Sequence, residues 1–344
     1  MSFEEKKVLV VGTGKSGVAA TELLLKEKVQ TVLFDANKEL DTKEFFEKNP
    51  SLNGVSLILG DLSDEQIKQF DIAVLSPGVP TDIPMVNRLR DAGVKIWGEI
   101  ELAYAFGKGR IIAITGTNGK TTTTALTGEI MADHYDDVRV VGNIGIPYTS
   151  MVQGTTEETV TVAEISSFQL ETIHEFKPHV SAILNITPDH LNRHHTMENY
   201  IKAKEDITKN QTADDFCVLN YEDEVLRTFA EKCPAKVIFF SSRRVLDEGF
   251  YLDGEEIMYA HDNKTDRVIN VNDLNLLGRH NYENVMAACA MSVSIGVPMY
   301  KIVEVLKTFK AVEHRIEYVT EKRGVRFYND SKGTNPDAVI QGIR

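Results

Sequence analysis

Residues 114–124 read ITGTNGKTTTT, and they follow residues 110–113 (RIIA), a short apolar run that predicts a buried strand. A strand, a glycine-rich turn, and then a lysine with several threonines form the pattern of a phosphate-binding loop. Gly116 and Gly119 allow backbone N–H groups to turn toward phosphate oxygens, and Lys120 is placed to reach the β- and γ-phosphates. Isoleucine replaces the first glycine of the standard pattern, but the loop still predicts a nucleoside-triphosphate site.

The threonines that follow the lysine support the same interpretation. Threonine is only a fair helix former, so four in succession at a helix start favour a phosphate role over a packing role. The hydroxyl of Thr121 can bind Mg²⁺. The predicted ATP-binding loop comprises Gly116, Thr117, Asn118, Gly119, Lys120, Thr121 and Thr122.

A second glycine turn lies about a hundred residues earlier, in residues 8–17 (VLVVGTGKSG). Its G-x-G-x-x-G spacing follows a predicted strand and opens a predicted helix, and Asp35 ends the next strand, where a ribose-binding acid would lie. One interpretation is a dinucleotide or another nucleoside diphosphate at the helix N-terminus. The other is a tight turn whose glycines serve only close packing.

The composition excludes several classes of protein. The 344 residues are enough for two or three domains, and a hydrophobic content of 42% provides sizeable cores. The net charge of −13 argues against a nucleic-acid partner, although local cations and N–H groups can still hold an anionic small substrate. Cys217, Cys233 and Cys289 form no C-x-x-C pair, which indicates reduced thiols.

The hydrophobicity of the sequence does not indicate a membrane protein. The first residues, MSFEEKK, do not resemble a signal peptide, and Val285–Val297, a mostly apolar stretch, is shorter than a membrane span. We therefore expect a cytoplasmic protein without a membrane partner, acting as a monomer.

Short β-branched runs alternate with helical patterns along most of the chain, which predicts an α/β architecture with parallel sheets. We expect a nucleotide-type β-α-β domain in residues 1–98, a central ATP-binding domain in residues 99–311, and the beginning of a third domain in residues 312–344. The expected strands are Lys7–Val11, Thr31–Asp35, Ile72–Ser76, Arg110–Thr115, Val138–Gly142, Thr159–Glu164, Val180–Asn185, Phe216–Asn220 and Lys236–Ser241, and a hairpin is expected from Arg315–Glu321 and Val325–Tyr328.

Polar residues follow two of the predicted buried strands. Glu164 ends one strand and should face the phosphate loop, where a carboxylate would bind Mg²⁺; a helix-capping or salt-bridging role is the alternative. Asp189, His190 and His194 follow another strand and suggest a metal cluster, but zinc would require better ligand spacing. We expect His194 and His195 to be exposed loop residues. His190 is the stronger candidate for a metal ligand, because it directly follows the end of a strand.

The motifs taken together resemble those of the muramyl ligases, ATP-dependent enzymes that form amide bonds in peptidoglycan assembly. The resemblance extends from about Val8 to the end of the chain, with the motifs in the family's order. They are TGTNGKTT (115–122), GNIG (142–145), NITPDH (185–190), YIKAK (200–204), GRHNYEN (278–284), EHR (313–315) and NDSKGTN (329–335). VGTGKSG (11–17), SPG (76–78) and EISSFQLE (164–171) are similar to the family branch that adds D-glutamate to UDP-N-acetylmuramoyl-L-alanine.

The resemblance implies that the first glycine turn holds a UDP-sugar and the second holds ATP, with Mg²⁺ as cofactor. The residues implied for the UDP-substrate are Lys15, Ser16, Asp35, Gly78, Asn143 and His190. Asn284, Arg315, Asp330 and Lys332 are implied to contact adenine, ribose or phosphates, in addition to the phosphate loop. The implied metal ligands are Thr121, Glu164, His190 and Lys204 as a carbamate, and the implied catalytic residues are Lys120, Glu164, His190 and Lys204.

For Lys204 the residues alone favour another interpretation, because lysines on a helix usually form a solvated basic face. The family also implies a Rossmann-like third domain that binds the amino acid, so we expect a partial chain with poor turnover. Asn192 stands where the family often has aspartate.

The alternatives are another muramyl ligase, a nucleotide-binding fragment without turnover, and a nicotinamide-dependent oxidoreductase. The last rests on the first glycine turn and Asp35, and it gives the second turn no role.

Overall fold

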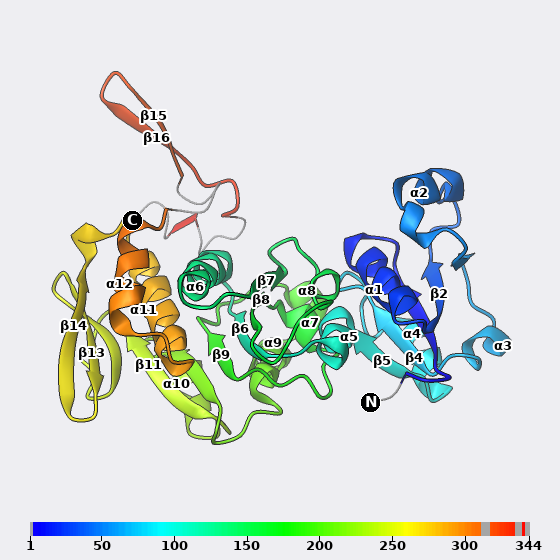
Figure 1. Cartoon of the computed structure of the whole chain (residues 1–344), viewed down its shortest axis with the longest axis horizontal. Helices are drawn as coiled ribbons and strands as arrows, with labels where there is room; N and C mark the ends of the chain where they lie inside the picture. The colour runs from blue at the N-terminus through cyan, green and yellow to red at the C-terminus, as the bar shows by residue number, and fades with distance from the viewer. Residues whose placement is uncertain (1–2, 311–316, 334–338, 341–344) are drawn as a thin grey trace. The chain divides into compact units, whose positions relative to one another are not determined.

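The computed structural model describes residues 3–310, 317–333 and 339–340, and the chain divides into two compact units (Figure 1). Unit 1 contains Met1–Gly109 together with two later segments, Val141–Glu157 and Ser166–Phe176. Unit 2 contains Arg110–Val140, Glu158–Ile165 and Lys177–Arg344. The predicted phosphate loop therefore belongs to unit 2, and the first glycine turn belongs to unit 1.

Unit 1 is built on a parallel sheet with strand order β3-β2-β1-β4-β5, the arrangement of a Rossmann-like fold. The strands are short and apolar because helices cover them, and Val8, Leu9 and Val10 in β1 have no exposed surface. The strands are β1 (Lys7–Val11), β2 (Gln30–Asp35), β3 (Ser56–Leu59), β4 (Ile72–Leu75) and β5 (Lys95–Gly98). The helices are α1 (Lys15–Lys26), α2 (Thr42–Lys48), η1 (Pro50–Leu52), α3 (Asp64–Ile67), α4 (Pro84–Asp91), α5 (Glu99–Phe106), η2 (Tyr148–Ser150) and α7 (Ser167–Leu170).

Unit 2 is built on a larger sheet, and its strand order is β14-β13-β12-β11-β10-β9-β6-β8-β7. Pairing is parallel from β12 through β11, β10, β9 and β6 to β8, whereas β12, β13 and β14 form an antiparallel meander. The strands are β6 (Arg110–Thr115), β7 (Val138–Gly142), β8 (Val160–Glu164), β9 (Val180–Ile183), β10 (Phe216–Asn220), β11 (Lys236–Ser241), β12 (Gly249–Asp253), β13 (Glu256–His261) and β14 (Lys264–Asn270).

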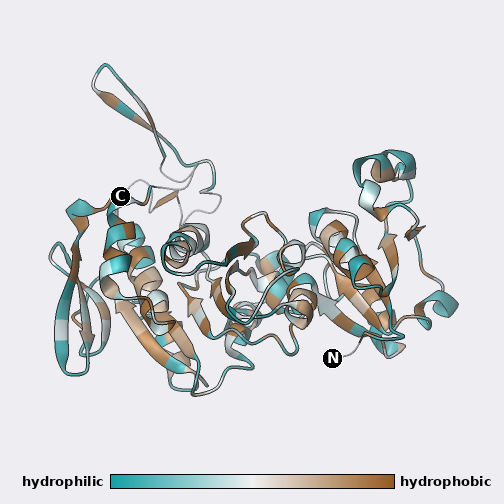
Figure 2. Cartoon of the chain, viewed as in Figure 1, coloured by the Kyte–Doolittle hydropathy of each residue, from teal (hydrophilic) through white to brown (hydrophobic). Residues whose placement is uncertain are grey.

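Three helices form the main cover of the unit 2 sheet. Helix α11 packs on strands β9 to β12, and α6 and α12 lie beside it (Figure 1). Most of the buried residues on α11 and the parallel strands are apolar, whereas the edge strand β14 is largely polar (Figure 2). The helices are α6 (Lys120–His134), α8 (Leu191–His194), α9 (Met197–Glu205), η3 (Asp206–Thr208), α10 (Glu224–Ala230), η4 (Val271–Asp273), α11 (Arg279–Ser294) and α12 (Met299–Thr308).

The structure confirms the α/β class, the parallel sheets and every expected strand, with end residues that differ by a few positions. The expected hairpin is present as β15 (Glu317–Lys322) and β16 (Val325–Asn329), while residues 311–316 lie outside the described part. Strands β3 and β5 of unit 1 and the meander of β12 to β14 were not expected. Among the described residues, no helix has the length and hydrophobicity that a bilayer span requires.

Candidate active site

Three of the predicted functional segments begin at the same edge of the unit 2 sheet. Strand β6 lies between β8 and β9, and in the parallel register Ile114 pairs with Glu164 while Thr115 pairs with Ile183. The phosphate loop, Glu164 and the loop after β9 therefore leave neighbouring strands at their carboxyl ends. This is the edge where parallel α/β sheets bind ligands.

The glycines of the phosphate loop are required by its geometry. Gly116 has φ +152°, and a Cβ atom there would lie 3.0 Å from the Cβ of Leu184. Gly119 has φ +84°, and a Cβ there would lie 2.3 Å from Oδ1 of Asn284. Helix α6 starts immediately after Gly119, so its N-terminus, with partial positive charge, faces the loop.

Two lysines converge on one carbonyl of this loop. The Nζ of Lys120 donates to Gly116 O at 2.9 Å and to Thr117 O at 2.8 Å. The Nζ of Lys204, from α9, donates to the same Gly116 O at 2.7 Å. The side chain of Lys204 also lies over the ring of Tyr200, with 4.8 Å between Nζ and the ring centroid.

Burial, followed by the charge of Lys120, holds the pKa of Lys204 well below its ordinary value of 10.5, although Asp189 acts in the opposite direction. Lys204 is only 2% exposed. The expectation from the residues alone, a solvated basic face, is therefore wrong for Lys204, because α9 turns this side chain into the loop. It holds for Lys202, which is exposed and pairs with Asp206.

The residues predicted to hold Mg²⁺ include one buried carboxylate. Glu164 is 2% exposed at the end of β8, and Thr121 is 9% exposed in the first turn of α6. Carboxylate and hydroxyl oxygens are the ligands that Mg²⁺ prefers, so the donor chemistry of these two side chains fits. Within the described ranges, no group of three or more His, Cys, Asp or Glu is arranged to hold a metal ion. Further ligands would have to come from phosphate oxygens, water or a modified lysine.

The histidines after β9 lie in different environments. His190 has φ +51° and is about half exposed, and its Nε2 lies 3.6 Å from Oδ2 of Asp189. His194 is 5% exposed at the end of α8 and packs on the ring of Tyr200, with 5.2 Å between the ring centroids. The expectation that His194 is an exposed loop residue is wrong, because the short helix α8 turns it inward. His195 is exposed, as expected.

A cavity of about 260 Å³ lies beside the phosphate loop at the N-terminus of α11. Asn284 lines it, and its Oδ1 accepts a hydrogen bond from the hydroxyl of Thr123 at 3.2 Å. His280 lies in the same wall, and burial lowers its pKa. The negative charge of Asp330 acts in the opposite direction and is weaker, which places Asp330 near this cavity. Other lining residues include Asn118, Gly119, Asn185, Asp223, Arg243 and Glu283.

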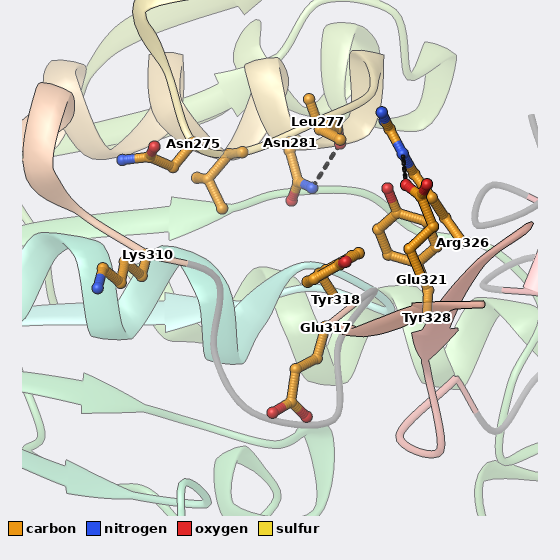
Figure 3. A pocket seen from close by; sticks show the side chains of 10 residues that line it. Asn275, Leu277, Asn281, Lys310, Glu317, Tyr318, Glu321, Arg326 and Tyr328 are labelled. Carbon is orange, nitrogen blue, oxygen red and sulfur yellow. Dashed lines mark hydrogen bonds and ion pairs between the residues drawn. The ribbon is translucent and has the colours of Figure 1, made fainter. Parts of the chain in front are cut away.

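A second cavity, of about 640 Å³, lies between the loop before α11 and the β15–β16 hairpin (Figure 3). Asn281 lines it and donates to Leu277 O at 2.7 Å, and Tyr318 and Tyr328 line it from the hairpin. Of the remaining residues implied for ATP, Lys332 is exposed, and Arg315 lies outside the described residues.

The first glycine turn closes tightly in unit 1. A Cβ atom on Gly17 would lie 1.8 Å from the carbonyl oxygen of Gly12, and a Cβ on Gly12 would lie 2.6 Å from Oγ of Ser76. Asp35 Oδ2 accepts hydrogen bonds from N (3.0 Å) and Oγ1 (2.7 Å) of Thr13. Burial acts to raise the pKa of Asp35, but the hydrogen bonds from Asn37 and Thr13 outweigh it, and the pKa is lowered.

The other residues implied for the UDP-substrate surround this turn or belong to the same unit. Lys15 and Ser16 begin α1, and Gly78 is exposed in the loop after β4. Asn143 is exposed in the segment Val141–Glu157, which also belongs to unit 1. His190, also implied by the resemblance, belongs to unit 2.

The structure adds two residues, Ser76 and Asn185, to the candidate residues that the motifs indicated. The Oγ of Ser76 is buried and has no hydrogen-bond partner among the described residues, beside Gly12 and Gly17. An unpaired buried hydroxyl is costly unless a ligand or water pairs with it. The other is Asn185, whose amide binds the phosphate loop. Both lie within quoted motifs, SPG and NITPDH, but only the structure shows what their side chains contact.

Comparison with known proteins decides the family. The description "Mur ligase middle domain" matches residues 114–292, and "Mur ligase MurD-like, N-terminal domain" matches residues 6–98. The UDP-N-acetylmuramoylalanine–D-glutamate ligase of Lachnoclostridium phytofermentans is 59% identical over 344 residues, which are 100% of this chain and 76% of the relative. The chain belongs to the Mur ligase family.

Other Mur ligases agree with this assignment. The UDP-N-acetylmuramoylalanine–D-glutamate ligase of Clostridioides difficile is 47% identical, over 100% of this chain and 76% of its own length. Among solved structures, UDP-N-acetylmuramate-alanine ligase MurC from Thermotoga maritima has a TM-score of 0.57 at 22% identity, covering 97% of this chain and 76% of that one. MurF ligase from Thermotoga maritima, solved in complex with ADP, has a TM-score of 0.55 at 17% identity, covering 99% and 72%. These structural matches establish the Mur ligase fold.

Proposed function

We propose that this Mur ligase uses ATP to join D-glutamate to UDP-N-acetylmuramoyl-L-alanine, releasing ADP and phosphate, in peptidoglycan precursor synthesis. The observation that carries the proposal is the identity of 59% to a ligase of that name over the whole chain. Two separate glycine turns on two units support it, because the reaction needs one site for a UDP-sugar and another for ATP.

The proposed UDP-substrate site lies in unit 1. The N-terminus of α1 would hold the diphosphate, with Lys15 and Ser16 in its first turn. Asp35 remains ionised through its hydrogen bonds to Thr13, so it can accept hydrogen bonds from the uridine. Gly78 and Asn143 complete the proposed set.

The proposed ATP site lies in unit 2. The N-terminus of α6 and the loop before it would surround the triphosphate, and Lys120 would move from the loop carbonyls to the β- and γ-phosphates. Asn284, Asp330 and Lys332 would contact adenine, ribose or phosphates, with Asn284 in the cavity wall next to Gly119. Arg315 is proposed from the family motif alone.

Glu164 and Thr121 would bind Mg²⁺, together with His190 and a carbamate formed on Lys204. The depressed pKa of Lys204 favours a neutral amine, which is the form that reacts with carbon dioxide. A bound Mg²⁺ would supply positive charge that reduces repulsion between the attacking carboxylate and the γ-phosphate.

The proposed chemistry begins with attack of the muramoyl-alanine carboxylate on the γ-phosphorus, which forms an acyl phosphate and releases ADP. The amine of D-glutamate then attacks the acyl carbon through a tetrahedral intermediate, and phosphate leaves as the amide forms. Lys120 would stabilise the charge on the transferring phosphoryl group. Because the reaction consumes ATP, we place it in the cytoplasm, and we propose that the chain acts as a monomer.

Calorimetric titration of the chain with UDP-N-acetylmuramoyl-L-alanine, and with NADH in parallel, tests the substrate assignment. Binding of the UDP compound alone supports the ligase. Binding of NADH alone would contradict it and favour a nicotinamide-dependent oxidoreductase. A second test is Lys120→Ala, which should abolish ATP binding and leave the UDP-substrate affinity within about twofold, because Lys120 belongs to unit 2. Loss of both affinities would contradict the assignment of the two sites to separate units.

A further inference from the structure

One side chain from the loop after β9, that of Asn185, holds the backbone of the phosphate loop. The Oδ1 of Asn185 accepts a hydrogen bond from Asn118 N at 2.8 Å, and its Nδ2 donates to Asn118 O at 3.1 Å. The carboxamide therefore pairs with both polar backbone groups of one loop residue, as a neighbouring β-strand would. The backbone carbonyl of Asn185 accepts a third bond, from Thr117 N at 2.9 Å.

The next residues after Asn185 add two more hydrogen bonds, and we call the whole set, between residues 117–118 and 185–187, the clamp. The hydroxyl of Thr117 donates to Thr187 O at 3.1 Å and accepts from Thr187 N at 3.0 Å. The loop after β9 and the phosphate loop thus form five hydrogen bonds over residues 117–118 and 185–187. Asn185 contributes three of these five, two of them through its side chain.

Asn185 is itself fixed on both sides. Before it, Leu184 N donates to Thr115 O at 3.0 Å, which continues the β6–β9 ladder. After it, Ile186 N donates to Oδ2 of Asp223 at 2.7 Å. The other carboxylate oxygen of Asp223 caps α10 by accepting from Val225 N at 3.0 Å. The clamp is therefore anchored to a strand and to a helix N-terminus.

The clamp determines which loop groups can face a phosphate. The N–H groups of Thr117 and Asn118 point toward Asn185, and the left-handed Gly119 then turns the chain into α6. A loop that binds phosphate tightly has its N–H directions set before the ligand arrives, because ordering the loop during binding would weaken affinity. Fixing residues 117 and 118 on Asn185 therefore orients the start of α6 in advance.

We propose that Asn185 is a positioning residue for the ATP site: its carboxamide holds Asn118 so that the start of α6 is preorganised for the triphosphate. This inference rests on the proposed ATP site. A carboxamide offers a donor and an acceptor side by side at this reach, whereas the ionised carboxylate of aspartate offers acceptors alone. Aspartate would keep the acceptor for Asn118 N but place a carboxylate oxygen against Asn118 O, and alanine would remove both bonds.

The test is calorimetric titration of this chain with ATP, comparing wild type with Asn185→Ala and Asn185→Asp. Removing two hydrogen bonds of ordinary net strength should weaken ATP binding about tenfold in Asn185→Ala. Asn185→Asp should bind ATP more weakly than wild type as well, since it loses the donor and adds negative charge near the phosphates. Affinity for UDP-N-acetylmuramoyl-L-alanine should stay unchanged in both variants.

Gln211→Ala is the matched control. Its side-chain amide also bonds to backbone, donating to Pro178 O at 3.0 Å and Phe216 O at 3.1 Å, but at the opposite ends of β9 and β10. Gln211→Ala should lower the melting temperature without changing ATP affinity. Amide hydrogen exchange provides a readout independent of ATP, because the amide of Asn118 should exchange faster in Asn185→Ala and not in Gln211→Ala.

The outcomes distinguish a failure of the proposed function from a failure of the positioning role of Asn185. If wild type does not bind ATP, the proposed function fails and this inference fails with it. If wild type binds ATP and folded Asn185→Ala binds it equally well, the proposed function stands and the positioning role is wrong. Should Asn185→Ala fail to fold, Asn185→Asp decides: unchanged ATP affinity would overturn the inference, and weakened affinity with a near-native melting temperature would support it.

Discussion

Replacement of Gly119 by alanine should damage the phosphate loop in two separable ways. The residue has φ +84°, where a side chain costs about 1–2 kcal/mol. The new Cβ would also lie 2.3 Å from Oδ1 of Asn284, which must move. That movement breaks the bond from the hydroxyl of Thr123 (3.2 Å) and the bond from Asn284 Nδ2 to Asn281 (3.2 Å), at about 1 kcal/mol each. The sum is a loss of about 3–4 kcal/mol from unit 2.

Gly254→Ala is the control for backbone strain. Gly254 has φ +58° in the turn between β12 and β13, and a Cβ there would meet no atom within 4 Å. This variant should lose only about 1–2 kcal/mol. Urea unfolding followed by circular dichroism measures both losses, and ATP titration should show weaker binding for Gly119→Ala alone. Equal stability losses in the two variants would refute the steric reasoning, because the displaced Asn284 is the difference between them.

Two predictions concern buried ionisable groups. Because folding lowers the pKa of Lys204, the unfolded state binds more protons, so the unfolding free energy of unit 2 should rise with pH toward 10.5. Lys204→Met should remove that rise and stabilise unit 2 by about 1 kcal/mol near pH 7 in urea unfolding, while abolishing any ligase turnover. Burial raises the pKa of Glu99, despite hydrogen bonds from Thr149, so the stability of unit 1 should fall as pH rises above 4.5. Glu99→Gln should lack this fall, measured by fluorescence of Trp97, the single tryptophan.

The periodic parts of the fold could be predicted from the sequence. The strand before the phosphate loop, Arg110–Thr115, has the same bounds in the structure, because an apolar run between a turn and a glycine loop fits few other conformations. The meander of β12 to β14 was missed because its strands are partly exposed and polar, as in Lys264–Asn270. Such strands lack the buried apolar pattern that identified most of the parallel ones, and the parallel strands β3 and β5, of four residues each, were missed as well.

Side-chain environment was harder to predict than secondary structure. Lys202 and Lys204 lie two residues apart on one helix, but one is exposed and the other is buried against the phosphate loop. His194 is buried and His195 is exposed, for the same reason. Local sequence gives the periodicity of a helix but not which face meets its neighbours. For Lys204, only the resemblance to a family suggested a role in the site, and that role stays a prediction.

Two segments of the chain belong to unit 1 although the sequence before and after each of them belongs to unit 2. Residues 141–157 and 166–176 fall within the stretch matched by the Mur ligase middle domain, but they pack with unit 1. Two buried carboxylates on α5 hold them there. Glu99 accepts from Thr149 N at 2.6 Å and Oγ1 at 2.8 Å, and Glu101 accepts from the N–H groups of His174, Glu175 and Phe176 at 2.8, 2.7 and 3.1 Å.

A buried carboxylate is costly unless hydrogen bonds satisfy it, so each of these glutamates favours one placement of the segment that it binds. Asn143, proposed to contact the UDP-substrate, lies in the segment that Glu99 holds. Loss of Glu99 should therefore weaken UDP-substrate binding although Glu99 need not touch the ligand. Glu99→Ala should raise the dissociation constant of UDP-N-acetylmuramoyl-L-alanine, whereas Glu99→Gln, which keeps an acceptor for Thr149, should restore most of the affinity. Equal weakening by both substitutions would show that the charge of Glu99, and not its hold on the segment, supports the site.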